Sequence, residues 1–390
     1  TTGTNNVAVG AFALDANTTA SYNTAVGYLA LSTNITGAGN VAVGTDSLYS
    51  NTSNYNTAVG YLALNINSTG TANVAIGKGA LDVNTTTSYN VAVGNNALGA
   101  NIAASNTAVG TDALAGNTTG TRNVAVGANA LDANVDGAKN VAVGMDALGT
   151  NIDGSRSVAI GDSALAVQEP ASAVDMYNTA VGHGAGSAVS TGYENTLIGG
   201  LAGDAINTGY RNTFVGVQAG SVTDDGYQNV VIGYKTCGVG NIGNNNTVVG
   251  DEAGEDLTGN SNTMLGRAAG IDVSSGDNNV LLGFDAGRTG SPGGNITTAS
   301  NILVIGDETI TASNIQVDWT VASDQRDKTD FTALDVGLDF VKALAPVTYK
   351  WDKRSKYIDK SDPSVDLDTI THDGTHKEDW LDIGFKAQEV

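Results

Sequence analysis

The chain has 390 residues, of which 51 are Gly and only 4 are Pro; 15% are charged, and the formal net charge is −22. Apolar residues make up 41% of the chain and recur regularly, which argues against disorder and favours an ordered but fibrous protein. The acidic charge repels phosphate backbones, so we expect no nucleic-acid partner.

The charge is unevenly distributed. Residues 1–322 hold 8 basic and 25 acidic residues, a net charge of −17, and residues 323–390 hold 10 basic and 15 acidic residues, a net charge of −5. Cys237 is the single cysteine, which excludes an intrachain disulfide and a cysteine-rich metal site. No stretch approaches 18 apolar residues, so we expect no membrane insertion. The chain opens with Thr and no signal-like segment, which we interpret as a cut within a longer polypeptide.

A repeated motif, NxxxG, dominates the chain. Neighbouring copies start 16 or 17 residues apart, except for steps of 21 and 22 residues near positions 157 and 279. Such a tight period predicts a solenoid rather than a row of globular domains. The eighteen copies start at Asn6, Asn23, Asn40, Asn56, Asn73, Asn90, Asn106, Asn123, Asn140, Ser157, Asn178, Asn195, Asn212, Asn229, Asn246, Asn262, Asn279 and Asn301.

Each repeat, which we call a rung, predicts a strand, a turn at the Gly, a short second strand and a polar loop. The second strand carries Ala-Leu in the first half, as in Ala130-Leu131, and Ala-Gly in the second half, as in Ala219-Gly220. The first strand becomes bulkier where Leu is lost. We therefore expect the first strand of the second-half rungs to supply the side-chain volume that the second strand no longer supplies, because a core must stay filled.

A single rung cannot be stable alone. Ordering its backbone costs roughly 17–34 kcal/mol, more than its few apolar side chains return. Rungs must therefore stack on one another, and a thin shaft gains most if several chains share one core, so we expect a homotrimer. The predicted fold is all-β: a parallel β-roll or β-solenoid shaft, followed by a small α+β domain.

The tandem NxAVGxxAL units resemble the head repeats of trimeric autotransporter adhesins and, more closely, the repeat shafts of phage tail-fibre proteins. That resemblance covers residues 6–306 and implies trimeric parallel β-rolls. We predict five segments: Ala-Leu rungs at 1–161, an insertion at 162–177, Ala-Gly rungs at 178–306, a neck at 307–322 and a C-terminal domain at 323–390.

The C-terminal segment has a different character. Apolar residues recurring at intervals of three and four predict an amphipathic helix that ends before Pro346, followed by a strand at 347–351, a polar loop at 352–380 and a further element from 381. The apolar residues of the helix are Phe331, Leu334, Leu338, Val341 and Leu344.

This segment resembles the C-terminal intramolecular chaperone of phage tail spikes, tail fibres and endosialidases, which trimerises a fibre and then cuts itself off. The resemblance implies cleavage between Ala322 and Ser323, with Ser323 as nucleophile, Lys328 as its base, and Asp324 and Arg326 holding the loop. Members of that family continue beyond the equivalent of Val390, so we expect the domain to be incomplete here. The matching residues are Ser323-Asp324, Arg326, Lys328, Gly337–Val341, Leu344, Pro346-Val347, Tyr349, Trp351, Ile383–Phe385 and Ala387–Val390.

From spacing alone, residues 323–328 form a solvated charged loop that caps a helix, and this alternative stays open. We expect no cofactor and no metal site: the acidic pairs Asp224-Asp225 and Asp251-Glu252, and Asp272, fit turns better than calcium loops. Tyr22, Tyr55, Tyr89 and Tyr177 either pack at rung corners, which we favour, or form an aromatic receptor-binding strip. The insertion is either a receptor-binding loop or a splice between two arrays.

Two functions fit these patterns. The first is a phage tail fibre or appendage of the virion, folded in the host cytoplasm, which binds a glycan or outer-membrane receptor on the host surface. Its enzymatic activity is at most self-cleavage by a Ser-Lys endopeptidase. The alternative is a trimeric adhesin or filament of the bacterial cell surface, which requires a secretion signal and an anchor.

Overall fold

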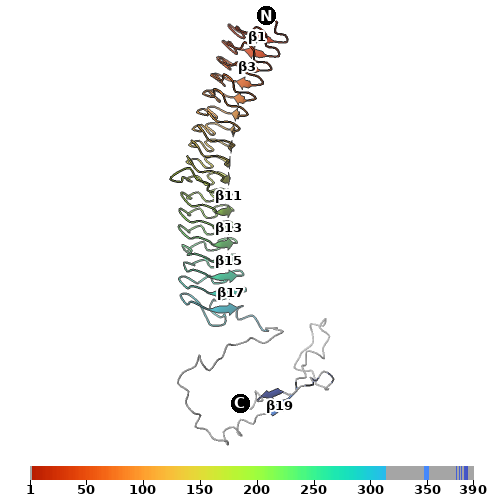
Figure 1. Cartoon of the computed structure of the whole chain (residues 1–390). Helices are drawn as coiled ribbons and strands as arrows, with labels where there is room; N and C mark the ends of the chain where they lie inside the picture. Colours follow the sequence, from red (N-terminus) through yellow and green to blue (C-terminus); the bar gives the residue numbers. More distant parts are fainter. Residues whose placement is uncertain are drawn as a thin grey trace. The chain divides into compact units, whose positions relative to one another are not determined.

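The computed structural model describes residues 2–312, 347–350, 375, 377, 379 and 382–384. The chain divides into two compact units, Thr1–Ser313 and Asn314–Val390. The first unit is a column of stacked rungs, with one strand per rung (Figure 1).

The strands of this column form one parallel sheet of eighteen strands, in which each strand pairs with the strands of the rungs before and after it. Identical positions of successive repeats face each other, as Val124 faces Val141. The prediction of an all-β parallel solenoid is therefore confirmed. The strands are β1 (Val7–Val9), β2 (Thr24–Val26), β3 (Val41–Val43), β4 (Thr57–Val59), β5 (Val74–Ile76), β6 (Val91–Val93), β7 (Thr107–Val109), β8 (Val124–Val126), β9 (Val141–Val143), β10 (Val158–Ile160), β11 (Thr179–Val181), β12 (Thr196–Ile198), β13 (Thr213–Val215), β14 (Val230–Ile232), β15 (Thr247–Val249), β16 (Thr263–Leu265), β17 (Val280–Leu282) and β18 (Leu303–Ile305).

The predicted second strand is wrong: in the column, the residues after each Gly form turns. The backbones of neighbouring rungs are still hydrogen-bonded there, since the Leu31 N–H donates to the Ser47 carbonyl at 3.0 Å. However, Leu29 and Leu31 have φ of 55° and 52°, in the left-handed region. A β-strand needs extended residues with negative φ, so this alternation gives a ladder without a strand.

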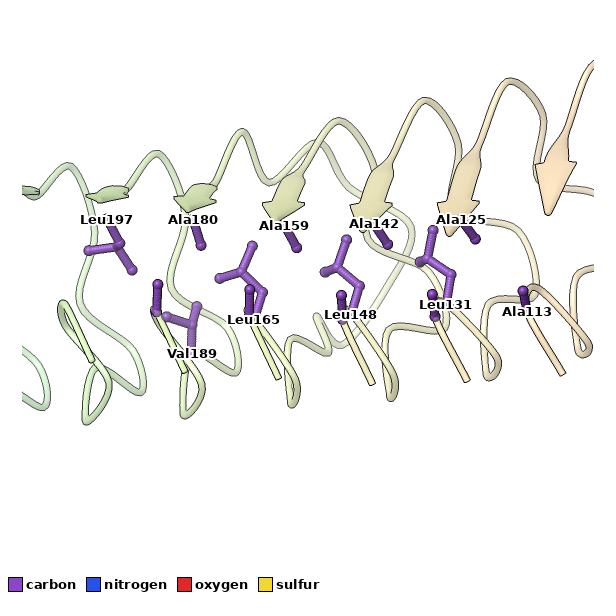
Figure 2. Packing of buried hydrophobic residues seen from close by; sticks show 14 of the residues in the cluster. Ala113, Ala125, Leu131, Ala142, Leu148, Ala159, Leu165, Ala180, Val189 and Leu197 are labelled. Atoms are coloured by element: carbon purple, nitrogen blue, oxygen red, sulfur yellow. The ribbon is translucent and has the colours of Figure 1, made fainter. Parts of the chain in front are cut away.

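The core of the column lies between the strand and this turn segment. In the first half, the Ala at the centre of each strand faces the Leu of the turn, as Ala142 and Leu148 do in Figure 2. Both side chains are fully buried. The Leu also has a left-handed backbone, as at Leu131 (φ 52°).

The second half fills the same space differently. Gly replaces Leu at the left-handed position, while the strand centre grows to Leu197 and Phe214, both buried. A Cβ on Gly186 would come within 2.6 Å of the Leu197 Cδ1 atom, so Leu no longer fits there. The predicted movement of volume into the strand is confirmed. Buried Val189 and Ile206 add further volume from the loop side.

Buried asparagines connect the rungs. The first Asn of each motif accepts a hydrogen bond from the next motif, as the Asn140 N–H donates to Asn123 Oδ1 at 2.9 Å. Its amide nitrogen donates to a loop carbonyl, as Asn123 Nδ2 donates to the Gly137 carbonyl at 2.8 Å. In the first half a second column of buried Asn does the same, with Asn134 Nδ2 donating to Asn117 Oδ1 at 2.7 Å. We predicted only turn chemistry for that second column.

The described part of the second unit is a two-stranded antiparallel sheet of β19 (Val347–Tyr349) and β20 (Asp382–Gly384). The strand predicted at 347–351 is thus confirmed over its first three residues. The predicted amphipathic helix before Pro346 lies outside the described residues. Within the described ranges, no helix is long and apolar enough to span a membrane.

Candidate functional site

The sequence-predicted cleavage site lies outside the described residues: this applies to Ala322, Ser323, Asp324, Arg326 and Lys328. Two other parts of the same motif are described, and the structure brings them together. Val347 faces Gly384, and Thr348 faces Ile383, in the antiparallel pair β19–β20. Motif residues more than thirty positions apart therefore form one sheet.

The outer face of the long sheet is the largest apolar feature of the shaft. The first and third residues of each strand point outward, and the third is Val, Ile or Leu in every rung. Several are about half exposed, such as Val9 (57%), Leu265 (54%) and Ile305 (50%). None of the eighteen strands contains a charged residue, although the chain has a net charge of −22. An uncharged apolar face thus follows the whole sheet.

Two columns of side chains border this face. The leading column consists of the residue before each motif Asn, and the trailing column of the two residues after each motif Gly. Tyr22, Tyr55 and Tyr89 of the leading column are 68%, 71% and 66% exposed. These rings are thus mostly exposed in the single chain, although the Tyr55 ring lies over Gly39 of the preceding rung and Tyr177 contacts Arg156. Exposed Arg122, Lys139 and Arg156 occupy the same column in the rungs of β8, β9 and β10.

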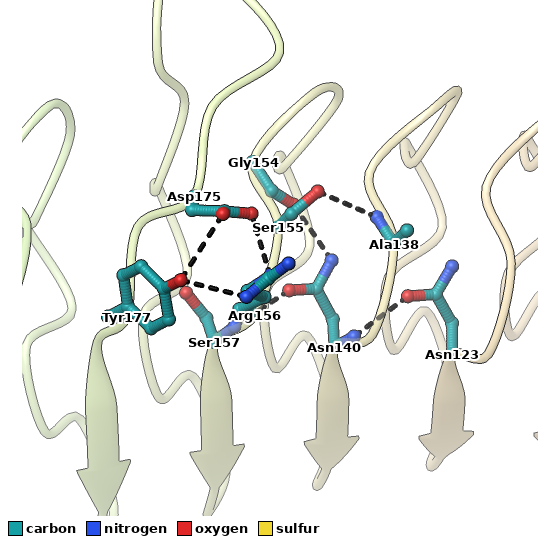
Figure 3. Close-up of polar contacts among 9 residues, drawn as sticks. All are labelled: Asn123, Ala138, Asn140, Gly154, Ser155, Arg156, Ser157, Asp175 and Tyr177. Atoms are coloured by element: carbon teal, nitrogen blue, oxygen red, sulfur yellow. Dashed lines mark hydrogen bonds and ion pairs between the residues drawn. The ribbon is translucent and has the colours of Figure 1, made fainter.

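The insertion joins the shaft through a polar cluster at its base (Figure 3). Asp175 pairs with Arg156 (Oδ1 to Nε, 2.9 Å), and Arg156 Nη1 donates to the Tyr177 hydroxyl at 2.8 Å. Buried Gln168 ends the second asparagine column, because its Nε2 donates to Asn151 Oδ1 at 3.0 Å. The tip, residues 171–174, is exposed. The root of the insertion is thus part of the column, and its tip is free to contact a partner.

The second half carries an aromatic stack that we did not predict. Tyr193, Tyr210 and Tyr227 lie parallel in successive rungs, with ring centroids 5.0 and 4.9 Å apart. Arg211 Nε pairs with Glu194 Oε2 beside them, at 2.6 Å. Their regular spacing of 17 residues was the available sequence signal.

Other chemistry on the shaft is sparse. Within the described ranges, no group of three or more His, Cys, Asp or Glu side chains is placed to hold a metal ion. Among the candidate acidic turns, Asp251 pairs with Arg267 at 3.5 Å and Asp272 with Arg288 at 3.9 Å. Burial raises the pKa of the Cys237 thiol, which occupies the position of the core Leu or Gly and keeps its left-handed backbone. This thiol is therefore a core side chain, not a reactive one.

Comparison with known proteins identifies the C-terminal segment only. Residues 323–390 match the family model described as the chaperone of endosialidase. No curated protein matches the chain. The match begins at Ser323, immediately after the predicted scissile bond, and ends at the last residue of the sequence.

Proposed function

We propose that this chain is the shaft of a phage tail fibre or virion appendage, and that its C-terminal domain trimerises the shaft. A long solenoid joined to a chaperone-of-endosialidase segment fits a fibre- or spike-like protein. The shaft extends from the virion to a receptor on the host surface, either a glycan or an outer-membrane component. Because each rung differs little from the next, the shaft serves to span the distance to the receptor rather than to carry a separate binding site in each rung.

The observation that carries this proposal is the uncharged apolar face of the eighteen-stranded sheet. Contiguous exposed apolar surface of this extent is an interaction surface in soluble proteins. Because the face is flat and follows every rung, the partner that matches it over its full length is another copy of the same shaft. Three copies arranged around one axis cover all three faces and leave no face open.

The C-terminal domain supplies what the shaft lacks. Near-identical rungs allow chains to pair with a shift of one rung, at almost the same free energy as the correct pairing. A domain that trimerises and follows the shaft in the sequence aligns three chains before their rungs pair. Folding then proceeds from one defined register.

We further propose that the domain releases itself at the Ala322–Ser323 bond. Neutral Lys328 takes the proton of the Ser323 hydroxyl, whose Oγ attacks the Ala322 carbonyl carbon. As the C–O bond forms, the C–N bond breaks and the proton held by Lys328 passes to the leaving nitrogen, which leaves an ester on the Ser323 oxygen and a free amino group on Ser323. Water then hydrolyses the ester, giving the Ala322 carboxylate and restoring the hydroxyl. Partial burial of Lys328 would lower its pKa enough for this role.

The test is to express the full-length protein and to measure its polypeptide mass and oligomeric mass. We expect a trimer of cleaved shafts for the wild type, and uncleaved trimers for Ser323→Ala and for Lys328→Ala. Ser172→Ala, at the exposed tip of the insertion, is the matched control and should cleave normally. A stable monomer would contradict the shaft proposal, and an uncleaved wild-type trimer would contradict self-cleavage alone.

A further inference from the structure

The leading and trailing columns carry matching side chains at the same heights. In the rung of β2, Tyr22 leads the strand and Tyr28 follows it; in the rung of β4, Tyr55 leads and Tyr61 follows. All four rings are at least half exposed. The rungs of β3 and β5 have no aromatic residue in either column. In the rungs of β2 and β4, exposed rings therefore occur on both borders, whereas Phe12 and Tyr89 are exposed rings on one border only of their rungs.

Charges in the middle of the shaft occur with opposite signs on the two borders of the rungs of β9 and β10. The leading column is basic in the rungs of β8, β9 and β10, through Arg122, Lys139 and Arg156. The trailing column is acidic in the rungs of β7, β9 and β10, where its residues are Asp112, Asp146 and Asp162. A basic border thus lies level with an acidic border on the other side of the sheet face.

Within one chain these charges have poor partners. Rungs are about 4.8 Å apart, so like charges stack directly within each column. Burial raises the pKa of Asp132, and neighbouring Asp146 and Asp112 raise it further, which reflects this crowding of carboxylates. Arg122 and Lys139 make no ion pair with any described residue. The opposite border is also out of reach, since six residue steps of about 3.3 Å separate the two columns.

The second half of the shaft provides the contrast. There, neighbouring charges within one column have opposite signs and pair inside the chain, as Arg211 pairs with Glu194 and Arg267 with Asp251. Charges that neutralise one another in this way need no second copy. In the first half Arg156 pairs with Asp175, but Arg122 and Lys139 have no such ion pair among the described residues and therefore point to a partner that brings the opposite charge to the same height.

We propose that the leading column of one copy packs against the trailing column of the next copy at the same rung, so that the two columns fix the register of the shaft. The inference rests on the proposed trimer, whose three sheet faces turn toward one axis. Rotation about that axis brings the leading border of each face to the trailing border of its neighbour, without any shift along the shaft. Tyr55 then packs on Tyr61 of a second copy, and Lys139 pairs with Asp146 of a second copy.

This arrangement adds a register signal that the strands lack. A shift of one rung separates the matched tyrosines. It also moves Lys139 level either with the rung of β8, whose trailing column has no acidic residue, or with the rung of β10, whose acidic residue is Asp162. Packing of exposed aromatic rings and opposite charges across an interface favours the correct partner and penalises shifted ones. The shaft therefore maintains the alignment that the C-terminal domain initiates.

Cysteine pairs test the proposed contact directly. Tyr55→Cys/Tyr61→Cys places both thiols in one rung, and Tyr55→Cys/Asn95→Cys places them two rungs apart in the same two columns. Within a chain the first pair lies too far apart for a disulfide, because a disulfide needs Cα atoms within about 7 Å. We expect mild oxidation or a short bismaleimide to convert the first variant to a covalent trimer, and to leave the second variant and Tyr55→Cys alone uncrosslinked.

The oligomeric mass of each variant separates the two proposals. A native trimer in which the same-rung pair does not crosslink, or in which the offset pair crosslinks instead, overturns the register inference and leaves the trimeric shaft intact. A monomer overturns the proposed function as well. Charge exchange gives a second measurement: Lys139→Glu should weaken assembly about tenfold, and adding Asp146→Lys, in the same rung, to the same chain should restore it. No recovery would contradict the pairing.

Discussion

The left-handed Leu of each first-half rung combines a cost and a gain in one residue. A non-glycine residue with this backbone costs roughly 1–2 kcal/mol, whereas a fully buried Leu side chain contributes about 1.5–3 kcal/mol. Leu131 (φ 52°) therefore stabilises the fold only if its side chain fills the core, because burial then offsets the cost of the left-handed backbone. Once the strand centre is as large as Phe214, Gly is the better residue at that position.

The buried asparagines are the residues on which the stacking depends most. Asn123→Ala would leave the Asn140 N–H without its partner inside the column, while the Gly137 carbonyl would keep only the hydrogen bond from Asn134 Nδ2. Each orphaned buried group costs about 1–3 kcal/mol, so we expect a clear fall in the thermal midpoint of the shaft. Asn95→Ala, at an exposed position, should change stability by less than about 0.5 kcal/mol. Equal midpoints for the two variants would contradict a structural role of the ladder.

At the scale of the element, the strands were predictable and the turns were not. Alternation within NxxxG identified each three-residue strand, because the motif repeats the same small and β-branched residues. The second strand failed because Leu strongly disfavours a left-handed backbone, so no propensity suggests Leu31 there. The second asparagine column was missed because Asn in a loop normally indicates a turn. Stacking against the neighbouring rung, which a single repeat does not contain, decides both features.

The exchange of volume between strand and turn predicts a compensating pair of substitutions. Gly220→Leu should destabilise the shaft by overpacking against Phe214, by roughly 1–3 kcal/mol, and Phe214→Ala should cost about 3–5 kcal/mol through the cavity it leaves. The double variant recreates the Ala and Leu of a first-half rung, so its loss should be smaller than the sum of the two. Thermal unfolding of the four chains gives the coupling. An additive result would show that the two side chains do not share one space.

For the whole molecule, the sequence indicated both the shaft and the chaperone segment, but not how copies meet. The proposed cleavage residues, Ser323 and Lys328, rest on the resemblance of the C-terminal segment to the chaperone of endosialidases, and they lie outside the described residues. The proposed contact between the leading and trailing columns could not be predicted from the sequence. Lys139 and Asp146 can be recognised as possible partners only once the structure shows that they lie in the same rung. A charged residue before an Asn looks like ordinary solvated surface until its neighbours in the column are known.

The acidity of the shaft predicts that it gains stability on mild acidification. Burial raises the pKa of each of five carboxyl groups, those of Asp82, Asp132, Asp136, Glu169 and Asp204. The folded chain therefore binds protons more readily than the unfolded chain. The stabilisation is complete below the unfolded pKa of about 4 and is lost as pH rises through the raised folded values. Asp307, whose pKa is lowered by hydrogen bonds from Thr309, acts in the opposite direction at one position only.

We therefore expect the thermal midpoint of the purified shaft to be higher near pH 4 than at pH 7. Relief of the charge repulsion within a chain of net charge −22 acts in the same direction. Asp132→Asn should raise the midpoint at pH 7 and flatten the profile, because the amide carries no charge to desolvate. Asp225→Asn, at an exposed position, removes the same charge and should leave the slope nearly unchanged. A midpoint that falls steadily from pH 7 to pH 4 would mean that carboxylate pairing across chains outweighs the burial of these acids.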